Sequence, residues 1–168
     1  QYAKNNDIEG LLHYLGQYQE EEDKQYIKRF CENDMVNNIL LVYMQKALES
    51  NIDMKADALL DNDVNIKESD FVSILGNILE NCIHGCLLYD GLDKYININI
   101  YMKANKVVII CKNSSHNDIT FINGIPQSKV STGIGIKSII HAVSKYDGEY
   151  DFSIDNHVFT TRILLNVD

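Results

Sequence analysis

The chain has 168 residues, of which 45% are apolar and 23% are charged, and its formal net charge is −9. At about 150 residues per domain, this length predicts one domain with a short appendage. The composition is typical of a globular protein and excludes disordered, collagen-like and disulfide-scaffold chains. Because the net charge is acidic and no Lys/Arg stripe carries interleaved aromatics, neither nucleic acid nor an anionic membrane surface is expected as a partner.

Membrane insertion and export are not expected from the sequence either. No window approaches the roughly 20 consecutive apolar residues that cross a bilayer, and the first residues lack the basic-then-apolar order of a signal peptide. Four cysteines lie in apolar stretches without a CxxC or Cys/His metal spacing: Cys31, Cys82, Cys86 and Cys111. We therefore expect a soluble chain with buried free thiols, and we assign no metal site to them.

The first 51 residues have a helical pattern. Residues 7–51 are predicted to be helical throughout, as a helical hairpin followed by another helix. The apolar residues at helical spacing are Leu11, Leu12, Leu15, Tyr26, Ile27, Phe30, Val36, Ile39, Leu40, Tyr43 and Ala47. The acidic cluster at 20–23 is interpreted as a solvated face.

Helices and strands are mixed in the rest of the chain. In chain order, the patterns predict a strand over 52–58, a long helix over 70–89, a hairpin over 95–111, a helix over 133–145 and a hairpin over 150–167. Ser69 is expected to cap the long helix, and Asp147-Gly148 to end the next one. The longest non-periodic stretch, residues 113–132, is expected to be a lid or binding loop. This order predicts an α+β fold with helices on one side of a mostly antiparallel sheet.

The long helix carries an unusual polar stripe. About half of its circumference is apolar, formed by Phe71, Val72, Ile74, Leu75, Ile78, Leu79, Cys82, Ile83 and Cys86. The opposite stripe is polar but nearly uncharged, formed by Ser73, Asn77, Glu80, Asn81 and His84. Amides at i and i+4 can present carbonyl oxygens to Mg²⁺ or donors to a phosphate. The alternative is that these asparagines only hydrogen-bond neighbouring loops.

A second indication of a binding site is the Gly-x-Gly sequence formed by Gly133 and Gly135 at the start of the next predicted helix. Glycines there allow backbone N–H groups to approach an anion, and a helix N-terminus favours phosphate. Lys129 and Lys137 flank these glycines and can neutralise the charge. Tight turning or close packing is the alternative explanation.

These motifs resemble a known family. Residues 71–81 look like the N box of the GHKL ATPases, which include gyrases, heat-shock chaperones, histidine kinases and MutL. Residues 133–139, 144–148 and 159–165 resemble the G2 box and terminal strands of sensor histidine kinases that serve as quorum-sensing peptide receptors of the accessory-gene-regulator type in Gram-positive bacteria. The resemblance implies a GHKL (Bergerat) two-layer sandwich over 33–168. Residues 1–32 would then be part of the dimerisation and histidine-phosphotransfer helices.

The resemblance also implies ATP and Mg²⁺ as ligands. Asn81 matches the asparagine that coordinates the Mg²⁺ bridging the ATP phosphates, and Asn77 would line the same pocket. Asn113 stands where the first glycine box usually has an aspartate that accepts the adenine amino group. The other implied cofactor-binding positions are His84, Ser128, Lys129, Gly133, Gly135 and Lys137. The chain departs from the family at His84-Gly85, where the subfamily often has Glu-Ala, and in a short lid.

The implied function is that of the catalytic region of a two-component sensor histidine kinase. Such an enzyme transfers the γ-phosphoryl group of Mg-ATP to a histidine and then to a response regulator. Because Asn77 occupies the place of the acidic base in hydrolysing relatives, transfer is favoured over hydrolysis. The resemblance further implies a homodimer and a cytoplasmic domain of a membrane-anchored bacterial receptor. The alternatives are a non-catalytic dimeric scaffold or phosphotransfer protein without kinase activity, and a serine-kinase-like GHKL regulator.

The resemblance of the N-terminal helices to the phosphotransfer region implies a phosphoacceptor histidine near Tyr2, yet residues 1–7 contain no histidine. His13 lies among apolar helical residues without an acidic neighbour, and we interpret it as structural. We therefore expect the chain to bind ATP without phosphorylating itself. The phosphoacceptor then lies upstream of Gln1 or has been lost.

Overall fold

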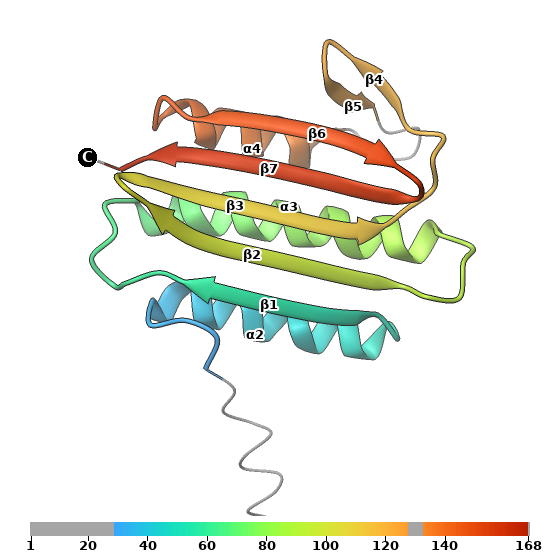
Figure 1. Ribbon diagram of the computed structural model, residues 1–168, viewed down its shortest axis with the longest axis horizontal. Coiled ribbons are helices and arrows are strands. Elements are labelled where there is room, and N and C mark those ends of the chain that lie inside the picture. Colours follow the sequence, from blue (N-terminus) through green and yellow to red (C-terminus); the bar gives the residue numbers. More distant parts are fainter. Residues whose placement is uncertain (1–28, 128–132, 168) are drawn as a thin grey trace, which may run out of the picture.

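The computed structural model describes residues 29–127 and 133–167, which form a two-layer α+β sandwich (Figure 1). One sheet has the strand order β1-β2-β3-β7-β6, and helices cover one of its faces. The elements are α2 (Asp34–Glu49), β1 (Asp53–Leu59), α3 (Glu68–Leu88), β2 (Tyr95–Lys103), β3 (Lys106–Ser114), β4 (Thr120–Ile122), β5 (Ile125–Gln127), α4 (Ile134–Ser144), β6 (Glu149–Asp155) and β7 (Val158–Asn166). The predicted α+β class is confirmed.

The sheet is mixed and mostly antiparallel, as expected. β1 and β2 are parallel because α3 connects them as a crossover, whereas the other neighbouring strands pair antiparallel. Alternate side chains of each strand point to the helical layer. Ile96, Ile98 and Ile100 of β2 are fully buried there, and Ile98 lies opposite Cys111 of β3. The core therefore lies between the sheet and the helices.

The long helix α3 is the centre of the helical layer. Of the nine residues on its predicted apolar face, eight are buried, and only Val72 is exposed. By length and composition alone α3 is apolar enough to cross a membrane, but the same test is passed by core helices of globular domains. Its apolar side chains form the hydrophobic core with the sheet.

Ser69 is not the N-cap of α3, so this prediction is wrong. The helix begins at Glu68 after Lys67, and no side chain caps it. Tertiary contacts hold this end instead. The Lys67 backbone N–H donates to the Tyr146 hydroxyl at 3.0 Å, and Asp70 accepts hydrogen bonds from Lys145 and Tyr146.

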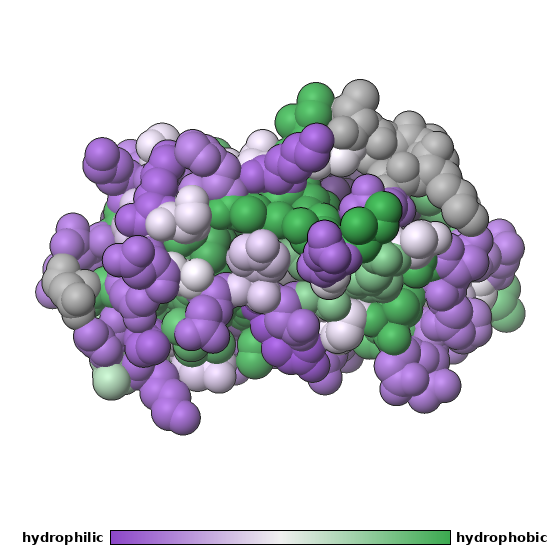
Figure 2. Space-filling model, turned by 90° about the horizontal axis from the view of Figure 1, so that it is seen from above, coloured by the Kyte–Doolittle hydropathy of each residue, from purple (hydrophilic) through white to green (hydrophobic). Residues whose placement is uncertain are grey.

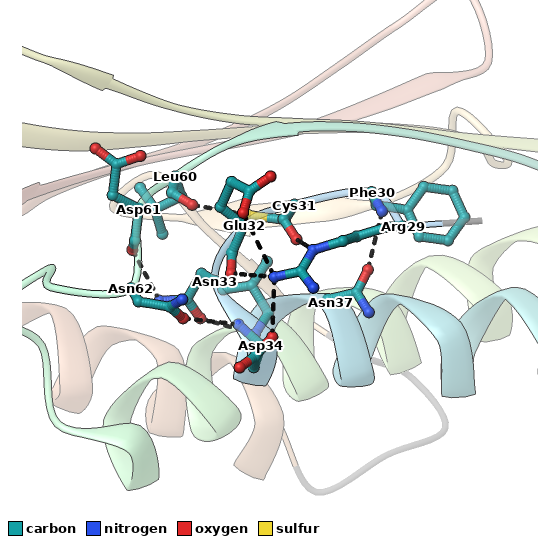
Figure 3. Close-up of polar contacts among 11 residues, drawn as sticks. Arg29, Phe30, Cys31, Glu32, Asn33, Asp34, Asn37, Leu60, Asp61 and Asn62 are labelled. Atoms are coloured by element: carbon teal, nitrogen blue, oxygen red, sulfur yellow. Dashed lines mark hydrogen bonds and ion pairs between the residues drawn. The ribbon is translucent and has the colours of Figure 1, made fainter. Parts of the chain in front are cut away.

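The segment 29–33 is irregular, which contradicts the prediction that residues 7–51 are helical throughout. Figure 3 shows the polar contacts that hold this segment against the loop after β1. The Asn33 backbone N–H donates to the Leu60 carbonyl at 3.0 Å, and Asn33 Nδ2 donates to the Asp61 carbonyl at 3.0 Å. Cys31 Sγ lies 3.2 Å from the Leu60 carbonyl. These long-range bonds compete with helical ones, and α2 begins only at Asp34. The predicted hairpin before residue 29 lies outside the described residues.

Asn33 joins two parts of the structure, because its Oδ1 also caps α2 by accepting from the Val36 N–H at 3.0 Å. We expect Asn33→Ala to lower the free energy of unfolding by about 1–2 kcal/mol, the usual value of an N-cap side chain. Urea unfolding checks this. Asn38→Ala, at an exposed position of the same helix, is the matched control and should change stability by less than about 0.5 kcal/mol. Equal midpoints for both variants would contradict the prediction.

The predicted loop 113–132 contains more regular structure than expected. Asn113 and Ser114 belong to β3, and β4 and β5 form a small hairpin. Its two turn residues, Asn123 and Gly124, have φ values of 50° and 75°, as tight hairpin turns require. The hairpin projects beside the sheet edge formed by β6 (Figure 1). Seen from above that edge, Figure 2 shows apolar side chains between hydrophilic flanks.

All four cysteines are buried and free, which confirms the prediction. Cys82 Sγ of α3 lies 3.4 Å from Cys111 Sγ of β3. The contact with Cys111, together with burial, raises the pKa of the Cys82 thiol well above its usual range. The Cys82 thiol therefore acts as a small core group at neutral pH.

Candidate functional site

A cavity of about 380 Å³ lies where the C-terminal half of α3, the end of β3, the start of α4 and the β4–β5 hairpin meet. In Figure 1 this is the right-hand end of the sandwich. The lining residues are Asn81, His84, Gly85, Leu88, Asn113, Ser115, His116, Asp118, Ile119, Pro126, Gln127, Gly133, Gly135, Ile136 and Phe159. The volume is in the range of small-molecule sites.

Asn113 provides a buried hydrogen-bond acceptor in this cavity. The residue is 2% exposed, and its Nδ2 donates to the Ser114 carbonyl at 2.9 Å. Because a carbonyl can only accept, this hydrogen bond assigns Nδ2 to the end of the amide that faces Ser114 and Oδ1 to the other end. Within the described residues, Asn113 Oδ1 has no hydrogen-bond partner. An unpaired buried acceptor is costly, so a ligand with an N–H donor would stabilise this site.

Apolar walls surround this acceptor. They come from α3, the segment after β3, β5, α4 and β7, as Leu88, Ile119, Pro126, Ile136 and Phe159. Phe121 of β4 stacks behind Phe159, with ring centroids 6.4 Å apart. Apolar walls with one buried acceptor suit a flat aromatic ring that carries an N–H donor.

Two amides of α3 converge on the start of α4. A methyl group added to Gly135 would lie 3.2 Å from Asn77 Oδ1 and 3.3 Å from Asn81 Oδ1. Asn77 Nδ2 donates to the Ser73 carbonyl at 2.6 Å, which orients the Asn77 amide. The structure therefore brings together three predicted residues, Asn77, Asn81 and Gly135. Amide oxygens are suitable ligands for a hard cation such as Mg²⁺.

The first turn of α4 adds backbone N–H groups to the same end of the cavity. Gly133, the N-cap, has the left-handed φ of 67°, and no side chain caps the helix. The N–H groups of this turn and the helix dipole favour an anion. Lys137 lies further along α4, exposed and outside the cavity lining.

The other predicted residues are placed differently. His84 is exposed and lines the cavity, whereas Glu80 turns away from the polar stripe to Lys46 of α2, with 3.1 Å between Lys46 Nζ and Glu80 Oε2. Ser128 and Lys129 lie outside the described residues. In the described part of the chain, no group of three or more His, Cys, Asp or Glu side chains could hold a metal ion. A cation at Asn81 would therefore depend on oxygens of the ligand, which is usual for Mg²⁺ with phosphates.

Several cavity residues were missed by the sequence patterns. Ser115 and His116 come two and three residues after Asn113, and this closeness in sequence was the one local signal for them. At the rim, His116 Nε2 lies 3.5 Å from Asp90 Oδ2, and the His116 ring meets the Tyr89 ring edge-on. The apolar walls carry no local signal because several separate elements supply them, whereas Gly85 stood out only as part of a departure from the family pattern.

A family model described as "GHKL domain" matches residues 66–166. None of the curated proteins is similar enough to count as a match. The catalytic domain of histidine kinase ThkA, in a nucleotide-free form, is similar with a TM-score of 0.66 and 16% identity, over 80% of this chain and 93% of that one. Acinetobacter baumannii histidine kinase AdeS is similar with a TM-score of 0.63 and 12% identity, over 97% of this chain and 81% of that one. The mycobacterial sensor histidine kinase MprB is similar with a TM-score of 0.59 and 12% identity, over 80% of this chain and 94% of that one. At these identities the likeness is one of fold.

Proposed function

Because the chain belongs to the GHKL domain family, matched over residues 66–166, we propose that it is the ATP-binding catalytic region of a two-component sensor histidine kinase. The observation that carries the proposal is the unpaired, buried Oδ1 of Asn113 in a cavity that also holds Asn81 and the start of α4. One cavity thus offers an acceptor for a base and an anion site for phosphates.

Each part of Mg-ATP has a matching group in this cavity. Asn113 Oδ1 would accept from the adenine amino group, with the ring between the apolar walls around Phe159. The N–H groups after Gly133 would bind the phosphates. Asn81 would hold Mg²⁺, which when bound neutralises phosphate charge and helps to orient the transferred group. Asn81 and Gly85, the residue beside Asn113, are four residues or about 6 Å apart along α3, so the metal ligand and the base acceptor lie beside successive turns of the same helix.

The side chains around Asn81 favour phosphoryl transfer to a protein group over hydrolysis. Asn77, one turn earlier, is an amide and cannot take a proton from water. Glu80, the neighbouring carboxylate on α3, is paired with Lys46 at 3.1 Å. We propose that a histidine accepts the phosphoryl group first and that a response regulator accepts it from this histidine.

The proposal extends to the assembly of the whole receptor. The segment before residue 29 would belong to the dimerisation and phosphotransfer region of a homodimer, and the catalytic region would be the cytoplasmic part of a membrane-anchored bacterial receptor. Residues 133–139, 144–148 and 159–165 resemble the G2 box and terminal strands of the quorum-sensing peptide receptors. This resemblance supports that subfamily of sensor histidine kinases for the whole protein.

We expect Mg-ATP to bind to this chain and to raise its melting temperature, because a ligand that binds only the folded state stabilises it. Asn81→Ala should weaken Mg-ATP binding by roughly tenfold or more through loss of the metal ligand. Isothermal titration calorimetry with Mg²⁺ present measures both affinities.

Asn38→Ala on α2 is the matched control, since it removes an exposed helical amide away from the cavity lining. It should bind Mg-ATP as the wild type does. Equal affinities for the wild type and Asn81→Ala would refute the role of Asn81. No binding by the wild type would refute the kinase proposal and favour a non-catalytic scaffold.

A further inference from the structure

We infer that Gly85 is a positioning residue that fixes which end of the Asn113 amide is offered to the bound base. Gly85 thereby sets a preference for a 6-aminopurine over a 6-oxopurine nucleotide. The inference rests on the proposed function, because it concerns the base end of the same cavity.

Gly85 stands in the interior of α3, where no turn or left-handed backbone requires a glycine. Glycine weakens a helix interior relative to alanine, so its presence there needs another reason. A methyl group at Gly85 would lie 2.8 Å from Asn113 Nδ2, closer than such contacts occur, and 3.7 Å from Ser115 Oγ. The missing side chain therefore leaves the space that the Asn113 amide occupies.

The amide of Asn113 is fixed from its other side as well. Its backbone lies in β3 between Ile96 of β2 and Phe159 of β7, so the main chain cannot shift easily. Its Nδ2 donates to the Ser114 carbonyl at 2.9 Å. Turning the amide over would place Oδ1 against that carbonyl, two acceptors facing each other. The unpaired atom is therefore an acceptor, Oδ1, and not a donor.

An acceptor in this position distinguishes purines by the group at carbon 6. An exocyclic amino group donates to Oδ1, whereas a 6-oxo group presents a second acceptor and leaves Oδ1 unpaired. A carboxylate at position 113 would present acceptors at either end and would need no such orientation. In this structure the amide of Asn113 fills the space that a side chain at position 85 would take, so the two residues act as a pair.

The test compares Mg-ATP with Mg-ITP, which carries a 6-oxo group, by calorimetry on the full chain. The wild type should prefer ATP by roughly tenfold or more. In Gly85→Ala the clash falls on the end of the Asn113 side chain, which can rotate away while α3 stays in place. The preference for ATP should then fall to nearly one, since rotation breaks the bond to Ser114 and moves Oδ1.

Gly76→Ala is the matched control in the same helix, because a methyl group there meets only Tyr43 Oη at an ordinary 3.5 Å. It should keep the wild-type ratio of ATP to ITP affinity. Asn113→Ala removes the acceptor without a clash and should also lose the preference. Adding Gly85→Ala to Asn113→Ala should change the ratio no further, since coupled residues are not additive.

The outcomes separate the inference from the proposed function. If the wild type binds Mg-ATP and Gly85→Ala keeps its preference over Mg-ITP, the inference is overturned and the kinase proposal stands. If Asn113→Ala keeps the wild-type ratio of Mg-ATP to Mg-ITP affinity, the inference is also overturned, even if Gly85→Ala fails to fold. If the wild type binds neither nucleotide, the proposed function fails and the inference with it.

Discussion

Replacing Gly148 by alanine is expected to lower the free energy of unfolding by about 3 kcal/mol, the upper end of the usual range for overpacking. Gly148 follows α4 at the point where the chain turns into β6. A methyl group there would lie against the Leu164 carbonyl oxygen, 2.8 Å from Val143 Cγ1 and 3.0 Å from the Val143 carbonyl oxygen. Two of these three atoms belong to the backbone and cannot rotate away. Urea unfolding followed by circular dichroism measures the effect.

Gly76→Ala is the control that separates the effect of the position from the effect of losing a glycine. Gly76 is helical and its neighbourhood has room for a methyl group, so this variant should be more stable by about 0.5–1 kcal/mol. A Gly148→Ala protein within 0.5 kcal/mol of the wild type would mean that α4 and β7 can move apart at this junction.

The same junction shows what a local pattern can predict. The Asp-Gly pair correctly indicated the end of the helix, which stops at Ser144. The left-handed residue, however, is Asp147, with a φ of 42°, and not the glycine after it. Gly148 is needed because of its contact with β7. That contact joins parts of the chain that are distant in sequence, and no local pattern records it.

The helices and strands in which apolar residues recur at a regular spacing were predictable from the sequence. The apolar face of α3 and the alternation of β2 and β3 follow from side-chain periods of 3.6 and 2, which depend only on neighbours in the chain. The errors lie where tertiary hydrogen bonds replace local ones. Residues 29–33 bond to the loop after β1, and Tyr146 with Lys145 replaces the expected Ser69 cap.

The candidate site was predictable to the extent that a single helix or loop carries it. Asn77 and Asn81 share one face of α3, and the Gly133-x-Gly135 sequence indicated an anion site, so both could be found by spacing. That Gly135 lies against the two amides, and that Gly85 makes room for Asn113, follows from the packing of α3 against α4 and β3. The direction of Glu80 likewise depends on α2, through Lys46.

The second large effect is expected for Asp70, the buried carboxylate in the first turn of α3. Its side chain is 7% exposed, and it accepts from Lys145 Nζ at 2.6 Å and from the Tyr146 hydroxyl at 2.9 Å. Asp70 therefore ties the start of α3 to the end of α4, which places Asn81 and Gly135 on facing helices. We expect Asp70→Asn to lower the free energy of unfolding by about 2 kcal/mol at pH 7. A fully buried pair would lose about 3–5 kcal/mol, but the Lys145 side chain is 46% exposed and partly solvated.

The pH dependence of this loss identifies its cause. The hydrogen bond from Lys145, supported by that from Tyr146, holds the pKa of Asp70 below its usual range, although burial opposes the shift. A carboxyl whose pKa is lowered by folding stabilises the protein above its unfolded pKa of about 3.9 and loses this contribution as the pH falls through the folded pKa. Urea unfolding from pH 7 down to pH 2 should therefore show the gap between the wild type and Asp70→Asn closing below about pH 4.

Asp151→Asn provides the matched control for the Asp70 experiment. Asp151 Oδ2 makes an equally short contact with Arg162 Nη1, 2.7 Å, but both side chains are about half exposed or more. Exposed ion pairs contribute little because water and salt screen them, so this variant should lose less than about 1 kcal/mol at pH 7. Comparable losses for the two variants would show that the burial of Asp70 does not set its contribution. A loss in Asp70→Asn that stayed constant down to pH 2 would show that packing around the α3–α4 contact, and not the charge of the carboxylate, holds the two helices together.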